Sequence, residues 1–277
     1  MSSATALRHQ IEHALESRFP AALSPASRTI RNVATTGIEE ADRLLEGGLP
    51  VGAISELAGP DSSGRTSLAL AFVAQRTAEE RVCAWVDAND AFDPESAAAN
   101  GVNLRRLLWV RCLDLSPAQQ TCASEKSAAK KSVPGEAKSS ARPWTRLWTR
   151  LDQALRATDL LLQAGGFASI VLDLGDTAPE HGNRIPLATW FRFRQAADRT
   201  RCSLVVLGKA PYAQSSAAVV LECAPLRAET AGGTVLRGFT YEVRRGRQRF
   251  SPFAQGARKP PASTWSATSS WEAEKRA

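Results

Sequence analysis

Residues 59–67 read Gly-Pro-Asp-Ser-Ser-Gly-Arg-Thr-Ser, and this stretch decides the fold. It fits the phosphate-binding loop pattern G-x-x-x-x-G-K-[ST] at every position except Arg65, which stands where the pattern has lysine. An apolar segment precedes the stretch and an apolar helical pattern follows it, as the motif requires. The sequence therefore predicts a phosphate-binding loop made by Gly59, Pro60, Asp61, Ser62, Ser63, Gly64, Arg65, Thr66 and Ser67.

The side chain at position 65 is the unusual feature of this loop. A lysine ammonium is a compact charge that can curl over phosphates, whereas the guanidinium of Arg65 is a wide planar fork. Thr66 keeps the hydroxyl that such loops direct at Mg²⁺. We expect the loop to attract an anion but to fit a triphosphate badly.

Strand and helix patterns alternate around the loop. Short apolar runs predict strands at 53–58, 81–87, 107–111, 168–174, 203–208, 217–223 and 234–244. Apolar residues at helical spacing predict helices at 38–45, 68–75, 144–162 and 187–198. This alternation predicts an α/β fold with a mostly parallel, twisted sheet that helices cover on both faces.

Composition excludes several classes of protein. The chain has 277 residues, 35 Lys and Arg against 28 Asp and Glu, and five Cys. No apolar run is long enough to span a membrane, and no signal peptide is recognisable. The cysteines show no CxxC spacing, so we expect reduced core thiols and a cytoplasmic location.

The positive charge is unevenly distributed. Residues 114–150 carry seven basic and three acidic side chains, and residues 227–277 carry ten and four. Residues 114–143 lose all periodicity and predict a disordered insertion. An anionic partner would meet the chain at these basic segments, although solvated charge is the simpler interpretation of the insertion.

The N-terminal segment has one apolar stripe, which predicts a short helix that docks on a partner subunit or on its own domain. The stripe includes Leu7, Ile11 and Leu15. We therefore expect an N-terminal helix and linker at 1–31, a core at 32–255 and a flexible basic tail at 256–277. Trp265 and Trp271 in this tail are candidates for a short binding motif, although two Trp residues in a disordered tail can also have no function.

Four segments together resemble the core of the RecA recombinase, in the same order. They are residues 32–70, 82–111, 170–174 and 243–255, and the Asp87-Ala-Asn-Asp-Ala-Phe-Asp93-Pro stretch makes the resemblance specific. The resemblance implies a RecA-like core with a C-terminal antiparallel hairpin, and ATP with Mg²⁺ as cofactor. Thr66 and Asp173 would then hold the metal.

The departures from the RecA pattern concern catalysis. Asn89 occupies the position of the glutamate that polarises the attacking water in RecA. An amide cannot accept that proton, and general-base catalysis is typically worth about 10² to 10⁴-fold. Asp90 could replace that glutamate only if its side chain points in the same direction as that of residue 89. Ser96 stands where RecA has the aromatic residue that stacks on adenine. We expect a degenerate ATPase with weak or no hydrolysis.

DNA contacts are also reduced relative to RecA. Only residues 175–186 and 209–216 occupy the places of the two DNA-binding loops, and the candidate contacts there are Arg184, Lys209, Tyr212 and Gln214. These are more simply interpreted as surface residues on short loops. Arg245 and Arg247 match two RecA lysines that reach the neighbouring subunit's nucleotide. They could instead lie on a solvated hairpin.

Among RecA relatives, the chain resembles the ImuA proteins, which act in SOS mutagenesis and translesion synthesis. That resemblance implies RecA, an ImuB-like Y-family polymerase homologue and an error-prone polymerase subunit as partners, with single-stranded DNA as a weak ligand. One alternative is an active DNA-dependent ATPase or recombinase. Another is a filament-binding regulator such as a division inhibitor.

Overall fold

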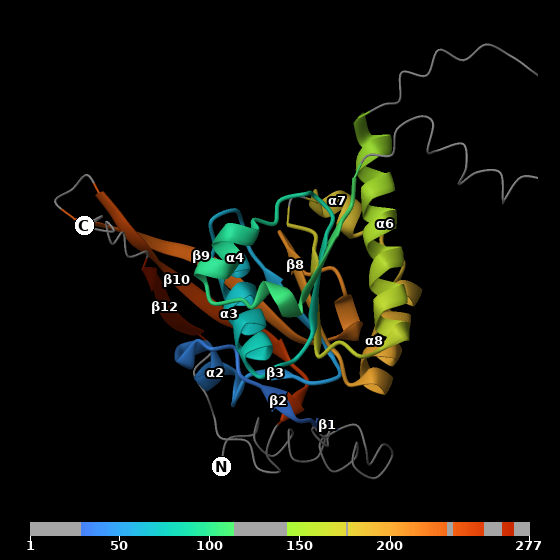
Figure 1. The fold of residues 1–277 in the computed structure, drawn as a ribbon, viewed down its shortest axis with the longest axis horizontal. Coiled ribbons are helices and arrows are strands. Elements are labelled where there is room, and N and C mark those ends of the chain that lie inside the picture. Colours follow the sequence, from blue (N-terminus) through green and yellow to red (C-terminus); the bar gives the residue numbers. More distant parts are fainter. Residues whose placement is uncertain (1–28, 114–142, 176, 232–234, 252–261, 269–277) are drawn as a thin grey trace, which may run out of the picture.

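The computed structural model describes residues 29–113, 143–175, 177–231, 235–251 and 262–268. The expected N-terminal helix with Leu7, Ile11 and Leu15, the expected insertion except for residue 143, and Trp271 lie outside these ranges. Within them the chain forms three layers, with helices on both faces of a twisted sheet (Figure 1).

An eight-stranded sheet is the central layer, in the order β12-β10-β9-β4-β8-β7-β5-β6. From β9 to the edge strand β6, neighbouring strands pair in parallel. These are β4 (Ile54–Ala58), β5 (Cys83–Asp87), β6 (Leu107–Arg111), β7 (Ser169–Asp173), β8 (Ser203–Gly208) and the start of β9 (Ala217–Ala231). Every expected strand is present, and the predicted mostly parallel α/β fold is confirmed.

The sheet becomes antiparallel toward the C-terminus. β9 pairs with β10 (Val235–Gln248), and β10 pairs with β12 (Ala262–Thr268). The expected hairpin is therefore present. The expected flexible tail is wrong for 262–268, because these residues add an edge strand whose Trp265 side chain is buried against Tyr241, with ring centroids 4.7 Å apart.

Two further small sheets and several helices complete the fold. The small sheets pair β1 (Thr29–Ile30) with β11 (Phe250–Ser251), and β2 (Val33–Ala34) with β3 (Leu49–Pro50). The helices are α2 (Glu39–Leu45), α3 (Arg65–Ala78), α4 (Pro94–Ala99), α6 (Pro143–Ala164), α7 (Pro179–Gly182) and α8 (Leu187–Thr200), with short 3₁₀ turns η1 (Leu104–Arg106) and η2 (Gln214–Ser216).

The core has two parts, one on each face of the sheet. Successive residues of β7 alternate between them, since Val171 packs with Phe72 of α3 while Ile170 and Leu172 pack with Trp190 of α8. Strands covered on both faces are apolar throughout, which is why their sequences read as continuous apolar runs. Four buried cysteines are free thiols, and burial raises the pKa of Cys202 and Cys223 to about 12.

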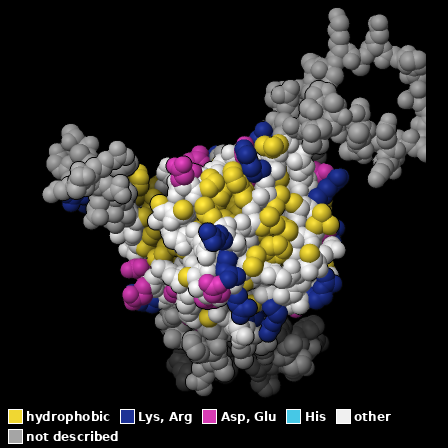
Figure 2. Space-filling view, in the orientation of Figure 1, with side chains coloured by type: hydrophobic (Ala, Val, Ile, Leu, Met, Phe, Trp, Pro, Cys, Tyr) yellow, Lys and Arg dark blue, Asp and Glu magenta, His cyan; other side chains and the backbone are white. Residues whose placement is uncertain are grey.

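One edge of the sheet stays partly open. β6 is the last strand on that side, and Leu108 on it and Leu104 in η1 are exposed. Figure 2 shows apolar side chains gathered over the middle of the face in view. No helix among the described residues is long and apolar enough to cross a bilayer.

Candidate functional site

The candidate site lies where the parallel strands end, because the carboxyl ends of β4, β5, β7 and β8 meet at one edge of the sheet. The loop 59–64 joins β4 to α3 there. Gly64 is the N-cap of α3 in a left-handed conformation, with φ of 81°, and a Cβ on it would lie 2.7 Å from the ring of Tyr241. A Cβ on Gly59 would lie 2.2 Å from the carbonyl oxygen of Cys223. Both glycines are therefore required by the packing of the loop.

Arg65 folds back into this loop instead of extending to solvent. Its Nη1 donates to the carbonyl oxygens of Gly59 and Pro60, the latter at 2.9 Å. Its Nη2 donates to the carbonyl oxygen of Gly175 at 3.1 Å and to Asp61 Oδ1 at 3.3 Å. The residue is only 7% exposed. The guanidinium thus spans the mouth of the loop and reaches the segment that follows β7.

Asp61 connects the loop to β8. Its Oδ2 lies 3.2 Å from Nζ of Lys209, which follows β8 directly, while Oδ1 faces Arg65. The hydrogen bond from Lys209 and the charge of Arg65 hold the pKa of Asp61 below its usual range. Lys209, expected to contact DNA, is therefore paired with a side chain of the phosphate loop.

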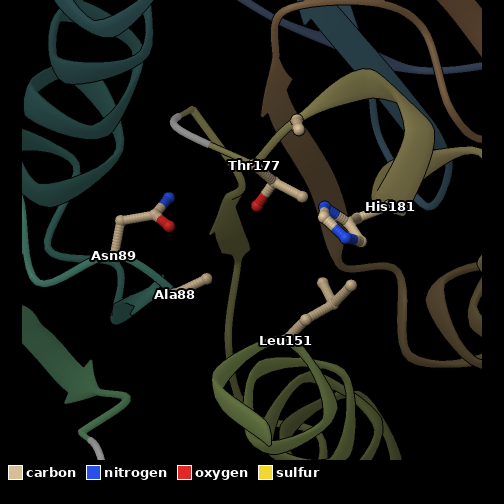
Figure 3. Close-up of a pocket in the computed structure, with 6 residues that line it drawn as sticks. Ala88, Asn89, Leu151, Thr177 and His181 are labelled. Carbon is tan, nitrogen blue, oxygen red and sulfur yellow. The ribbon is translucent and has the colours of Figure 1, made fainter. Parts of the chain in front are cut away.

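The segment after β5 carries Asn89, at the position of the glutamate that polarises the attacking water in RecA. Asp87 closes this turn, accepting hydrogen bonds from the backbone N–H of Asn89 at 3.1 Å and of Phe92 at 2.8 Å. Asn89 follows on the same turn, and Figure 3 shows its amide extending toward the segment after β7. It borders a pocket of about 10 Å³ that Thr177 and His181 also line, which is room for about one water.

Asp90 does not replace the glutamate. Both of its carboxylate oxygens accept from Arg111 at the end of β6, Oδ1 from Nε at 2.7 Å and Oδ2 from Nη2 at 2.9 Å. Arg111 also lies over the ring of Trp109 and lowers the pKa of Asp90. A carboxylate bound in this bidentate way with a lowered pKa is a poor proton acceptor.

Ser96 has a structural role. Asp93 is the N-cap of α4 and accepts hydrogen bonds from the backbone N–H groups of Glu95 and Ser96 and, at 2.5 Å, from the Ser96 hydroxyl. These hydrogen bonds lower the pKa of Asp93. The position that carries the adenine-stacking ring in RecA is thus part of a helix cap.

A cleft of about 290 Å³ lies beside these groups. It is lined by Arg65, Thr66, Leu70, Trp85, Asn89, Ala91, Phe92, Asp93, Ser96, Asp173 and Gly175. Asp173 Oδ1 accepts a hydrogen bond from the backbone N–H of Gly175 at 2.9 Å. The structure therefore brings together the phosphate loop, Asn89 and Asp173, as the sequence predicts.

The residues around the cleft fit Mg²⁺ better than they fit the phosphates of ATP, the cofactor that the resemblance implies. Thr66 and Asp173 both line the cleft and offer the oxygen ligands that Mg²⁺ prefers. The phosphate loop itself does not fit, because the Arg65 guanidinium is already bonded to three backbone carbonyls across the loop mouth. A triphosphate would have to displace this side chain.

The expectation that Tyr212 contacts DNA is wrong. The Tyr212 side chain is 1% exposed, its ring lies against Gly182 and Gly208, and its hydroxyl donates to the carbonyl oxygen of Thr177 at 3.3 Å. A ring packed in this way cannot stack on a base. Arg184 and Gln214 are exposed.

Sequence reasoning missed the residue that holds this loop. Glu56 of β4 is buried, and its Oε1 accepts from the backbone N–H of Tyr212 at 2.5 Å and of Ala213 at 2.7 Å. Burial raises the pKa of Glu56, and the other oxygen, Oε2, has no hydrogen-bond partner. A carboxylate inside an apolar strand is itself the signal that could have revealed it.

Arg245 and Arg247 on β10 both turn back to their own chain. Arg245 Nη1 lies 2.9 Å from Gln248 Oε1 and 3.9 Å from Glu46 Oε1 of the buried Glu46 side chain. Arg247 donates to the carbonyl oxygen of Gln214, and partial burial lowers its pKa. In this structure they pack the hairpin onto the core. No group of three or more metal-ligating His, Cys, Asp or Glu residues occurs in the described ranges.

The strand order, the phosphate-loop sequence after β4 and the carboxylate of Asp173 at the end of β7 are those of a P-loop α/β fold. Residues 9–115 match the model of the RecA N-terminal domain. The crystal structure of the RadB recombinase is similar with a TM-score of 0.50 and 17% identity, covering 80% of this chain and 93% of that one. The chain therefore has the RecA-like fold.

Individual RecA proteins are similar over part of the chain. RecA of Nostoc sp. is 38% identical over 104 residues, which are 38% of this chain and 29% of that protein. RecA of Deinococcus radiodurans is 43% identical over 100 residues, 36% of this chain and 28% of that protein. The chain thus spans less than a third of the length of these relatives.

Proposed function

We propose that this chain is a RecA-like accessory protein of the ImuA type, which serves damage-induced (SOS) mutagenesis and translesion synthesis through contacts with other proteins. Its partners would be RecA, an ImuB-like polymerase homologue, an error-prone polymerase subunit, or a combination of these. ATP hydrolysis would be weak or absent, and contact with single-stranded DNA weak.

The observation that carries this proposal is the bonded state of Arg65. A P-loop ATPase needs a mobile point charge at this position, and here the guanidinium is buried and both of its terminal nitrogens donate to carbonyl oxygens. Weak hydrolysis is also expected because no carboxylate is placed to accept the proton of the attacking water: Asn89 is an amide, and Asp90 is paired with Arg111. The burial of Tyr212 supports weak DNA contact.

The first test is ATP hydrolysis by the purified chain with and without single-stranded DNA. We expect no stimulation by DNA, and the Asp173→Ala variant to have the same background rate as the wild type. DNA-stimulated turnover that Asp173→Ala abolishes would overturn the proposal. It would favour the alternative of an active ATPase, which the places of Thr66 and Asp173 in the cleft support.

The second test concerns the partners. In cells that lack the chain, damage-induced mutation should be restored by the wild type and equally by Asp173→Ala. Purified RecA, ImuB-like protein and error-prone polymerase should be tested separately for binding. Binding to none of them, together with failure to restore mutation, would contradict the accessory role.

A further inference from the structure

The Arg65 side chain bonds both to the phosphate loop itself and to the segment that follows β7. It bonds the start of the loop at Gly59 and Pro60, the loop side chain Asp61, and the backbone at Gly175. Both terminal nitrogens of the guanidinium donate to these acceptors. Only Nε lacks a partner in the structure.

The bond to Gly175 connects strands that are not neighbours. β8 lies between β4, which ends in the phosphate loop, and β7, which ends at Asp173. In P-loop proteins a phosphate on the loop and its metal ion, held by a carboxylate, make the corresponding link between these two strand ends. Here a side chain makes it.

We propose that Arg65 is a built-in occupant of the phosphate loop, which takes the place of nucleotide as the link between the loop and the end of β7. The loop is thereby kept closed without a ligand. The proposal rests on the low-hydrolysis part of the proposed function and adds how the fold dispenses with nucleotide.

The shape of guanidinium explains why arginine suits this role. Its planar fork directs N–H groups in several fixed directions, which lets it serve the carbonyls of Gly59, Pro60 and Gly175 together. The neighbouring Asp61 balances the buried charge, and Lys209 holds Asp61 in place. A lysine has a narrower reach and would leave part of the loop mouth free.

Thermal unfolding of the full chain, with and without ATP and Mg²⁺, tests the proposal in three variants. Arg65→Met keeps an unbranched side chain but removes the donors, so we expect its melting temperature to fall by roughly 5–10 °C. Arg65→Lys should fall less, and ATP with Mg²⁺ should raise its melting temperature by about 5 °C at a hundredfold excess over Kd.

Arg43→Met is the matched control. Arg43 makes an exposed i,i+4 pair with Glu39 on α2, so its loss should leave the melting temperature unchanged. The wild type should show no shift with ATP and Mg²⁺. A wild-type shift as large as that of Arg65→Lys, or an Arg65→Met variant as stable as the wild type, would overturn the proposal.

Hydrogen exchange of the wild type covers the case that Arg65→Met does not fold. The backbone N–H groups of residues 59 and 61–67 should exchange at the same rates without and with ATP, and protection that appears only with ATP would overturn the proposal. Nucleotide binding without hydrolysis would refute the occupant role alone, whereas DNA-stimulated hydrolysis would refute the proposed function.

Discussion

The phosphate loop 59–67 and the segment 209–216 follow neighbouring strands, β4 and β8. The sequence predicts a phosphate site in the first and offers only candidate DNA contacts in the second. Both are closed in the structure, but in different ways. The phosphate loop is filled by the single side chain of Arg65 and adjoins a cleft of about 290 Å³. The other segment is closed by the buried ring of Tyr212 and by Glu56 beneath it.

The difference shows which former site can be reopened. One polar side chain can leave the phosphate loop without exposing core, since Thr66 and Asp173 already line the adjoining cleft. Tyr212 cannot leave its site without opening a cavity. We therefore expect single substitutions to restore nucleotide binding but not base stacking.

The largest effect should come from Tyr212→Ala. Removing a fully buried aromatic ring costs about 3–5 kcal/mol of unfolding free energy. Tyr212→Phe keeps the ring, loses one hydrogen bond to Thr177 and should cost about 1 kcal/mol. Denaturant unfolding measures both. If Tyr212→Ala weakened binding of single-stranded DNA without loss of stability while Tyr212→Phe did not, the ring would be a DNA contact after all.

Gly59→Ala should come next, at about 3 kcal/mol or somewhat less. The new Cβ would meet the backbone oxygen of Cys223 at 2.2 Å, and backbone in a sheet cannot move aside cheaply. The control is Gly166→Ala, where φ is 86° and no atom lies within 4 Å, so only the backbone strain of about 1–2 kcal/mol remains. Equal losses in the two variants would show that the loop packing does not matter.

The third prediction concerns the rate of ATP hydrolysis when a carboxylate is restored beside the phosphate loop. In the Arg65→Lys background, Asn89→Glu should raise the rate of ATP hydrolysis by about 10²-fold, since it restores a proton acceptor beside the cleft. Asp90→Asn in the same background should leave the rate unchanged because Asp90 is paired with Arg111. A rate of ATP hydrolysis that falls with Asp90→Asn would show that Asp90, and not the residue at position 89, accepts the proton.

The smallest effect concerns pH. Since burial raises the pKa of Glu56 above 4.5, the unfolded chain releases this proton first as pH rises, and the folded state loses stability until the folded-state pKa is passed. Glu56→Gln should remove this loss, and so gain stability relative to the wild type as pH rises above 4.5. Urea unfolding at several pH values measures it, and a constant difference at all pH values would contradict the raised pKa.

Much of the fold could be predicted from the sequence. The buried strands read as apolar runs because both faces are covered, and the two glycines with Thr66 marked the phosphate loop. The strand 262–268 was missed because its residues, Ala-Ser-Thr-Trp-Ser-Ala-Thr, are small and polar and follow a Pro-rich stretch. Its pairing with β10 depends on a distant partner that local pattern does not reveal.

The candidate site could be predicted in membership but not in geometry. The sequence places Arg65, Asn89 and Asp173 at strand ends that must meet. It does not say that Arg65 bonds to Gly175, 110 residues away, or that Arg111 takes both oxygens of Asp90. Such contacts depend on side-chain direction and strand register, which only the folded chain defines.

The pairing of β12 with β10 has a practical consequence for deletion mapping. The Trp265 ring lies on Tyr241, and Tyr241 lies against Gly64, so a stack of two rings supports the phosphate loop from the side of β12. A chain cut before residue 262 would lose that support and leave β10 as an open edge prone to aggregation. Lost partner binding by such a truncation would then report damage to the core, and informative deletions should begin after Thr268.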